Sequence, residues 1–245
     1  MGLVAGLFSG MFGIGGGILI VPALTMLAGF SQKLASGTSL AAIIPLSLVG
    51  VSSYATSGSL SLVGAILIAL GALGGAQIGT WLLNRLPVRI LKLIFSLFIV
   101  VAIVSLFLVV PSRDAALVIT WLSALALIIL GVAVGVLSGL LGIGGGAIVV
   151  PSLMLLFGVS DLVAKGTSLL MMLPTAISGT WGNWRHGNVN LKAAVAIGLP
   201  ACVTTTLGAW VAHLIPPLAG NILFAAFLAF VALRMFLEAV RKSKR

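Results

Sequence analysis

Two runs of glycine are the residues of this chain whose type and spacing point to chemistry. Gly13-Ile14-Gly15-Gly16-Gly17 lies inside a long apolar stretch, and Gly142-Ile143-Gly144-Gly145-Gly146 repeats it. Four glycines in five positions make a helix unfavourable by roughly 1 kcal/mol each relative to alanine, so we expect the backbone to unwind. A helix that restarts at about Ile18 or Ala147 presents free N–H groups and a positive dipole end. Both runs therefore predict helix breaks that favour an anion.

Hydroxyl and amide side chains flank both runs and complete the candidate site. Ser9 and Ser138 precede the runs by one turn, and a Gly-Thr-Ser triplet begins the next predicted helix of each copy. The candidate substrate-binding residues are Ser9, Gly13, Gly15, Gly16, Gly17, Thr38, Ser39, Gln77, Ser138, Gly142, Gly144, Gly145, Gly146, Thr167 and Ser168.

Several of these positions have a second, purely structural interpretation. The Thr-Ser pairs also suit helix capping, and Gln77 also suits a hydrogen bond between helices. Pro45 and Pro174 interrupt a predicted helix near its middle, where a proline frees a carbonyl and bends the helix. They are candidate hinges or static kinks, and both interpretations stay open.

The glycine runs belong to an internal duplication. GLFSGMFGIGGGILIVPAL (6–24) recurs as GVLSGLLGIGGGAIVVPSL (135–153), an offset of 129 residues (142 minus 13). Held without a gap, the same offset pairs Pro45 with Pro174 and Trp81 with Trp210. A broken helix in each of two repeats is how many transporters build a binding site at mid-membrane.

Composition places the chain in a membrane. Hydrophobic residues make up 61% of the 245 and charged residues 7%, with a mean hydropathy of +1.33. Successive apolar runs approach the ~20 residues that cross a bilayer. We predict an all-α polytopic membrane protein with nine hydrophobic segments at about 2–29, 34–57, 60–83, 88–110, 115–133, 135–158, 163–184, 189–212 and 216–237.

The nine segments divide into two repeats of four joined by a connecting helix. The predicted divisions are a first repeat at 1–111, a connecting transmembrane helix at 112–134, and a second repeat at 135–245 that ends in a basic tail. Five spans separate equivalent points, and five is odd, so the repeats are expected to lie in opposite orientation. Whether the first segment spans as a broken helix or dips in and returns stays open.

Basic residues set the orientation. With the carboxyl terminus in the cytoplasm, alternate loops leave only Arg113 and Lys165 outside, each close to an aspartate. The other eleven lie inside: Lys33, Arg85, Arg89, Lys92, Arg185, Lys192, Arg234, Arg241, Lys242, Lys244 and Arg245. This asymmetry predicts that the carboxyl terminus lies in the cytoplasm.

The polar residues exclude several kinds of site. The three acids, Asp114, Asp161 and Glu238, all lie at predicted span ends, so no proton relay or cation cage is expected in the membrane. Cys202 is the one cysteine, so no metal centre, cofactor or disulfide is expected, and the scattered basic residues do not form a nucleic-acid surface. A neutral cavity of amides and hydroxyls suits a small anion.

The doubled G-x-x-S-G-x-x-G-x-G-G-G-x-x-x-V-P pattern, each copy followed by G-T-S and a mid-helix proline, resembles the sulfite exporter TauE/SafE family over essentially the whole chain. The resemblance implies a multi-pass transporter of the cell (inner) membrane for small sulfur-containing anions such as sulfite, sulfoacetate, thiosulfate or related organosulfonates. Its expected partners are the substrate and the bilayer, with a homo-oligomer open.

Two other functions compete with this interpretation. Gly2, Gly6 and Gly10, with their equivalents Gly131, Gly135 and Gly139 and the further row Gly71, Gly75 and Gly79, are spaced for close helix packing. If the glycine runs also serve only packing, the chain is a membrane scaffolding or assembly protein. An intramembrane enzyme or cofactor-binding subunit would need a nucleophile–base pair or deep ligands, and Cys202, His186 and His213 are not spaced for that.

Overall fold

A computed structural model gives the structure of the chain. It describes residues 1–108, 117, 119–216, 218–219, 222, 225–226, 229 and 233, and in these ranges the regular elements are all helical. The described helices are α1 (Gly2–Phe12), α2 (Gly17–Leu27), α3 (Gln32–Thr56), α4 (Leu62–Arg85), α5 (Val88–Leu108), α6 (Trp121–Leu141), α7 (Gly146–Phe157), α8 (Asp161–Arg185) and α9 (Leu191–Leu214). The predicted segment at 216–237 lies largely outside the described residues.

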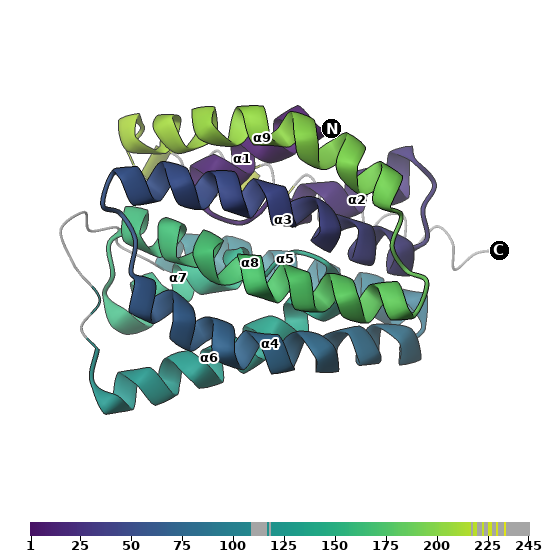
Figure 1. Cartoon of the computed structure of the whole chain (residues 1–245), viewed down its shortest axis with the longest axis horizontal. Coiled ribbons are helices and arrows are strands. Elements are labelled where there is room, and N and C mark those ends of the chain that lie inside the picture. The colour runs from purple at the N-terminus through teal and green to yellow at the C-terminus, as the bar shows by residue number, and fades with distance from the viewer. Residues whose placement is uncertain are drawn as a thin grey trace.

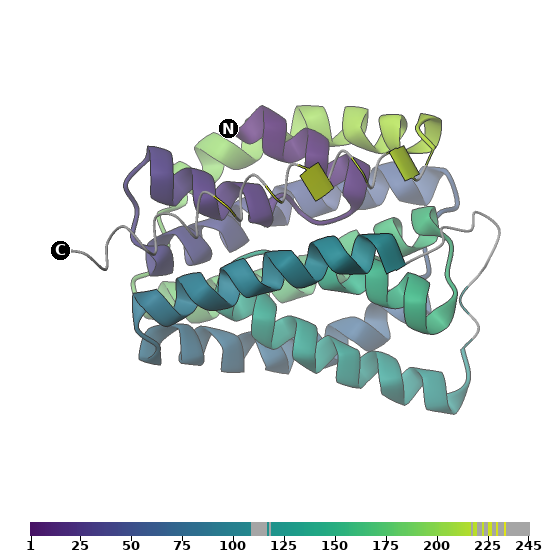
Figure 2. The ribbon, with the colours of Figure 1, turned by 180° about the vertical axis from the view of Figure 1, so that it is seen from behind.

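The long helices run along one common direction, so the molecule has two ends (Figures 1 and 2). α3 begins at one of them, on the right in Figure 1, where α4 and α8 end and α9 begins. We call it the Lys33 end, because the Lys33 Nζ donates to the Asn84 carbonyl at 2.8 Å there. α8 begins at the opposite end, which we call the Lys165 end. α3 and α8 therefore run antiparallel.

Two layers of helices pack against one another through α3 and α8. One layer holds α1, α2, α3 and α9, and the other holds α4, α6, α7 and α8, as Figure 1 shows. Within the first layer α9 packs on α1 and α3; within the second, α4 packs on α6 and α8 in the same way. Each layer thus combines helices from both halves of the sequence.

Helix bounds repeat at the offset of 129 residues. α3 and α4 begin and end 129 positions before α8 and α9, and the starts of α2 and α7 differ by the same number. The caps repeat as well: Ser31 accepts from the Leu34 amide as Ser160 accepts from that of Val163. Side-chain oxygens at these positions satisfy amides that a helix start leaves free. The duplicated sequence folds into duplicated local structure.

One predicted boundary is wrong. The sequence divides a connecting segment ending at 133 from a segment beginning at 135, whereas α6 runs without interruption from Trp121 to Leu141. A single glycine inside a helix costs only ~1 kcal/mol relative to alanine, so Gly135 does not end the helix. The helix ends instead at Gly142, whose φ of 75° is left-handed. The fifth and sixth predicted segments therefore share one helix.

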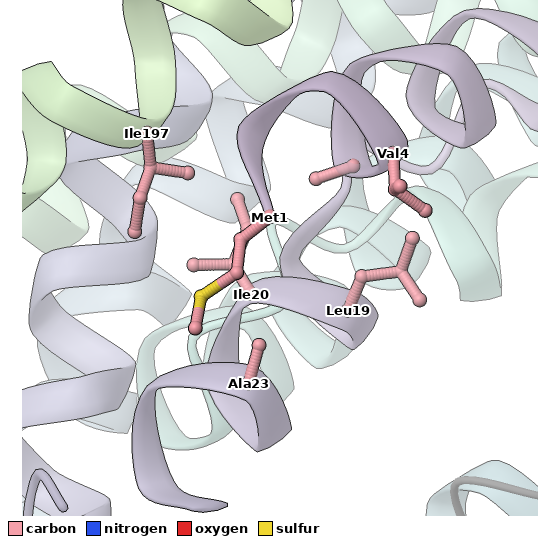
Figure 3. Close-up of a pocket in the computed structure, with 7 residues that line it drawn as sticks. Met1, Val4, Leu19, Ile20, Ala23 and Ile197 are labelled. Atoms are coloured by element: carbon pink, nitrogen blue, oxygen red, sulfur yellow. The ribbon is translucent and has the colours of Figure 1, made fainter. Parts of the chain in front are cut away.

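The first segment turns back on itself. α1 runs from the amino terminus toward the Lys165 end, and α2 returns toward the Lys33 end, where α3 begins (Figures 1 and 2). Val4 and Ala5 of α1 line the same hollow as Ile20 and Ala23 of α2 (Figure 3). α6 begins at the Lys165 end, and α7 returns to that end, where α8 begins. α6 and α7 therefore form the equivalent hairpin. Each glycine run is the tip of a helical hairpin.

Glycines allow each hairpin to approach a long helix closely. A Cβ on Gly75 would lie 3.0 Å from the Val136 amide nitrogen, and one on Gly10 would lie 2.7 Å from that of Ala209. These distances leave no room for a side chain. The glycines spaced four residues apart on α1, α4 and α6 therefore serve helix packing.

The described helices fit a bilayer. Five of them, α3, α4, α6, α8 and α9, are long and apolar enough to cross it. Large aliphatic side chains such as Leu70, Leu199 and Val203 are exposed along their lengths. The exposed tryptophans Trp81, Trp121, Trp184 and Trp210 lie near helix ends, as an interfacial aromatic belt requires. The chain is a multi-pass membrane protein.

Candidate substrate site

Both glycine runs are unwound, as the sequence predicts. Gly13, Gly15 and Gly16 have φ values of 68°, 71° and 69°, and their equivalents have 75°, 79° and 87°. This left-handed region is favourable for glycine and costs other residues energy. α1 and α6 therefore end at the first glycine of a run, and α2 and α7 begin at the last.

Backbone amides accumulate at each break. Gly16 O accepts from Leu19 N and Ile20 N, and Gly13 N donates to Ser9 O, but the amides from Ile14 to Ile18 have no acceptor among the described residues. The second break repeats this pattern, with Gly145 O accepting from Ile148 N and Val149 N. Neither α2 nor α7 has a side-chain cap. Each break thus has the free donors and the helix start that bind an anion.

The two breaks touch each other. A Cβ on Gly17 would lie 2.6 Å from Ile143 Cα and 2.7 Å from the Gly142 carbonyl oxygen. A Cβ on Gly146 would lie 2.8 Å from Ile14 Cα. The contacts are reciprocal at the offset of 129, so each break meets the other through equivalent residues.

Two apolar side chains fill the space beside the breaks. Met172 Cε is in direct contact with the Cβ positions of both Gly15 and Gly144, and Ile43 Cδ1 lies 3.1 Å from that of Gly144. Ile43 and Met172 are equivalent at the offset of 129, lie near the middle of α3 and α8, and are fully buried. Sequence reasoning missed them, because an isoleucine or methionine inside an apolar helix gives no signal. In this conformation the breaks are closed to solute.

The serine side chains predicted for the site are buried. Ser9, Ser39 and Ser138 are fully buried, and their hydroxyls have no hydrogen-bond partner among the described residues. Ser138 Cβ lies 3.7 Å from the Cβ position of Gly145. The Ser168 hydroxyl donates to the Gly13 carbonyl and lies 3.0 Å from that of Lys165. A buried hydroxyl without a hydrogen-bond partner is costly, so the hydroxyls of Ser9, Ser39 and Ser138 could each bond to a ligand.

The threonines of the same triplets hold the scaffold. The Thr38 hydroxyl accepts from the Asn190 amide at 3.0 Å, and the Thr167 hydroxyl accepts from the Ser61 amide at 3.0 Å. Asn190 and Ser61 are the N-caps of α9 and α4. Each threonine therefore accepts a hydrogen bond from the N-cap residue of a helix in the other half of the chain.

Gln77 makes its contacts away from the breaks. Its Nε2 donates to the carbonyl and the hydroxyl of Ser178, both at 2.8 Å, which joins α4 to α8. This is the interhelical role that sequence analysis left open beside ligand binding. Pro45 and Pro174 lie inside α3 and α8, two residues after Ile43 and Met172, and both helices continue through them.

Two hollows elsewhere on the molecule have no lysine or arginine in their lining. One of about 220 Å³ lies between α1, α2 and α9 and is lined entirely by apolar residues, including Met1, Val4 and Leu19 (Figure 3). Another of about 310 Å³, lined in part by Ser57, Thr206 and His213, has hydroxyls and an imidazole but no lysine or arginine. Across the part of the chain that the structure describes, no three His, Cys, Asp or Glu residues gather as a metal site would require.

Comparison with known proteins identifies the family of the chain. The sulfite exporter TauE/SafE family profile matches residues 1–169 and again residues 127–245, which together cover the chain. The chain belongs to this family. No solved structure matches it.

Curated relatives with similar sequences are named as membrane transporters. The chain is 30% identical over 232 residues to the probable membrane transporter protein YunE of Bacillus subtilis, with 85% of each chain covered. It is 28% identical over 257 residues to a probable membrane transporter protein of Haemophilus influenzae, covering 97% of this chain and 96% of that one. Probable membrane transporter protein MJ0441 of Methanocaldococcus jannaschii is also 28% identical, over 254 residues.

Proposed function

We propose that this family member transports small sulfur-containing anions, such as sulfite, sulfoacetate, thiosulfate or a related organosulfonate. The substrate binds at mid-membrane between the two GIGGG breaks, where backbone amides and the Ser9, Ser39 and Ser138 hydroxyls replace its hydration shell. One observation supports this most directly: two helix N-termini and their unpartnered amides meet at the contact of Gly17 with Ile143.

The two halves act as inverted repeats in this proposal. Reciprocal contacts favour a pseudo-two-fold axis, because Gly37 packs on the Asn188 carbonyl as Gly166 packs on that of Ser59. The antiparallel course of α3 and α8 favours an axis in the membrane plane. The divisions at 1–111, 112–134 and 135–245 then describe the evolutionary repeats, apart from the continuity of α6.

Alternating access follows from the closed breaks. Met172 and Ile43 contact both Gly15 and Gly144, so a substrate enters only when these side chains withdraw. Pro45 and Pro174 lie one half-turn beyond them and supply the bends at which α3 and α8 change shape. The Lys33 end lies on the cytoplasmic side of the inner membrane in this proposal, because basic residues favour that side. The helix ends at the Lys33 end carry Lys33, Arg85, Arg185 and Lys192.

Transport of sulfite into proteoliposomes tests the proposal. Purified protein is expected to move sulfite faster than protein-free liposomes, and Gly16→Leu is expected to abolish this flux. Gly29→Leu is the matched control, because Gly29 has the same φ of 69° but no neighbour within 4 Å. Both variants carry the same backbone strain, so a loss confined to Gly16→Leu assigns the effect to the break.

The scaffolding alternative predicts a different result. If the glycine runs serve only packing, the wild-type protein moves no sulfur-containing anion at all. Absence of flux for sulfite, thiosulfate and sulfoacetate in a folded, inserted preparation refutes the transport proposal.

A further inference from the structure

A buried ion pair lies beside the first break. Lys165 Nζ is 3.2 Å from Asp161 Oδ2, and the two side chains are only 12% and 3% exposed. The other carboxylate oxygen, Asp161 Oδ1, is buried without a hydrogen-bond partner among the described residues. Charges in such surroundings are costly and are usually retained for a function.

Lys165 adjoins the break through its backbone. A Cβ on Gly13 would lie 2.7 Å from Lys165 Cα and 2.8 Å from its Cβ. Ser168, on the next turn of α8, reaches both the Gly13 and the Lys165 carbonyls through its hydroxyl. The lysine therefore stands where the first glycine run begins, one turn inside the Lys165 end.

The second break has the same construction without the charges. Gln32 and Ser36 occupy the positions equivalent to Asp161 and Lys165, and a Cβ on Gly142 would lie 2.5 Å from the Ser36 carbonyl oxygen. The Gln32 side chain is buried, and its amide nitrogen and oxygen have no partner among the described residues. We call these two residue pairs the mouths of the site: Asp161 and Lys165 form a charged mouth, and Gln32 and Ser36 form a neutral one.

We propose that Lys165 admits the anion at the Lys165 end and that Asp161 is its resting partner. The arriving substrate replaces the Asp161 carboxylate on the ammonium, so the lysine exchanges one anion for another and is never left unpaired. Asp161 lies in the first turn of α8, where the helix dipole favours a negative charge, so it remains stable once displaced. This inference rests on the proposed transport function.

Sidedness follows from the difference between the mouths. Lys165 lies directly against the first break, so its charge raises the affinity of that break for an anion, and dissolved salt screens the effect. The Lys33 end has more basic residues, but the two positions equivalent to Asp161 and Lys165, beside the second break, hold no charge. The transporter is therefore expected to bind its anion more tightly from the Lys165 end than from the Lys33 end.

Replacement of the charged mouth by the neutral one tests the inference. The double variant Asp161→Gln with Lys165→Ser places beside the first break the same two residue types, glutamine and serine, that lie beside the second break. In oriented proteoliposomes with radiolabelled sulfite, this double variant is expected to raise KM at least tenfold from the Lys165 end. KM from the Lys33 end is expected to stay within twofold. The double variant leaves the net charge unchanged, and Lys192→Ser, which makes the same lysine-to-serine change away from the break, is the control for KM.

Single variants separate anion recognition from a structural ion pair. Asp161→Gln alone removes the carboxylate that competes with the substrate for Lys165, so KM is expected to fall several-fold at low salt, with the gain vanishing in concentrated chloride. Lys165→Arg keeps the charge and is expected to retain a low KM, whereas Lys165→Gln removes the charge and is expected to raise KM. These single variants test the inference even if the double variant fails to insert.

Three results overturn the inference. A double variant with wild-type KM from both ends shows that the pair is not used. A higher KM in Asp161→Gln, matching that of Lys165→Gln, shows a purely structural pair. A wild-type protein that moves none of sulfite, thiosulfate and sulfoacetate removes the proposed function and this inference together, whereas wild-type flux with unchanged variants removes this inference alone.

Discussion

Replacement of Gly17 by alanine tests the contact between the two breaks. Gly17 has no positive φ, so alanine fits its backbone conformation without strain. The added methyl group would lie 2.6 Å from Ile143 Cα and 2.7 Å from the Gly142 carbonyl oxygen, against at least ~3.4 Å for an ordinary contact. Both obstacles are backbone atoms, so the second break must shift by almost 1 Å.

The sign of the stability change depends on this contact. Overpacking a well-packed site costs about 1–3 kcal/mol. Alanine in place of glycine at a helical position contributes up to about 1 kcal/mol in the opposite direction. We expect Gly17→Ala to be destabilising by about 1–2 kcal/mol. If the breaks lay apart, the same substitution would be neutral or stabilising.

Reversible unfolding in SDS, followed by tryptophan fluorescence, measures the difference. Gly74→Ala is the matched control, because Gly74 lies inside α4 with no neighbour within 4 Å and is expected to be stabilised by up to about 1 kcal/mol. Gly17→Ala that behaves like Gly74→Ala would refute the contact.

A double-mutant cycle sharpens the result. Gly146 makes the reciprocal contact, with Ile14 Cα 2.8 Å from its Cβ position. Once Gly17→Ala has forced the breaks apart, Gly146→Ala should cost less than it does alone, giving a coupling of about 0.5–3 kcal/mol. Strictly additive effects would mean that the two breaks do not share one contact.

Three further predictions concern the closed site and its scaffold. Met172→Ala removes the side chain that contacts both breaks, so it is expected to destabilise the protein by about 2–5 kcal/mol in SDS unfolding while lowering the KM for sulfite; a raised KM would contradict the plugging role. Ser9→Ala and Ser138→Ala each remove an unpartnered hydroxyl, so each is expected to weaken sulfite binding severalfold without loss of stability; unchanged affinity would exclude them from the site. Thr167→Val leaves the buried Ser61 amide without its acceptor and is expected to cost about 1–3 kcal/mol of stability with an unchanged KM, and a change in KM alone would assign the hydroxyl to substrate instead.

Sequence reasoning located the helix breaks because glycine clusters conflict with helix formation over a short range. The conflict appears at Gly15 and Gly16, where positive φ requires glycine. The same reasoning placed an unneeded boundary before Gly135, because an isolated glycine that packs against α4 is as visible in sequence as one that ends a helix. Neighbouring backbone, not composition, separates the two uses.

Long-range contacts explain what the sequence left undetermined. Hydropathy cannot distinguish a broken spanning helix from a hairpin, since both place apolar residues in the same order. The contacts that accompany the turn, of Gly13 with Lys165 and of Gly17 with Ile143, join residues far apart in the sequence. Met172 and Ile43 face the breaks only through the packing of α3 on α8. Asp161 lies at a predicted span end, yet it is only 2% exposed, because burial depends on neighbours distant in sequence.

The packing of the hairpins decides which parts can move together. The α1–α2 hairpin comes from the first half of the chain but docks through glycines on α9, from the second half, and the α6–α7 hairpin docks on α4 in the same exchanged manner. Close backbone contacts of this kind are rigid, since no side chain lies between the helices to absorb a shift. A rocking motion would therefore separate the layer of α1, α2, α3 and α9 from that of α4, α6, α7 and α8, and not one sequence repeat from the other. Both glycine breaks lie at the boundary between these layers, so relative movement of the layers acts directly on the contact between Gly17 and Ile143. A cross-link confined to one layer should leave transport intact, whereas one that joins α3 to α8 should stop it.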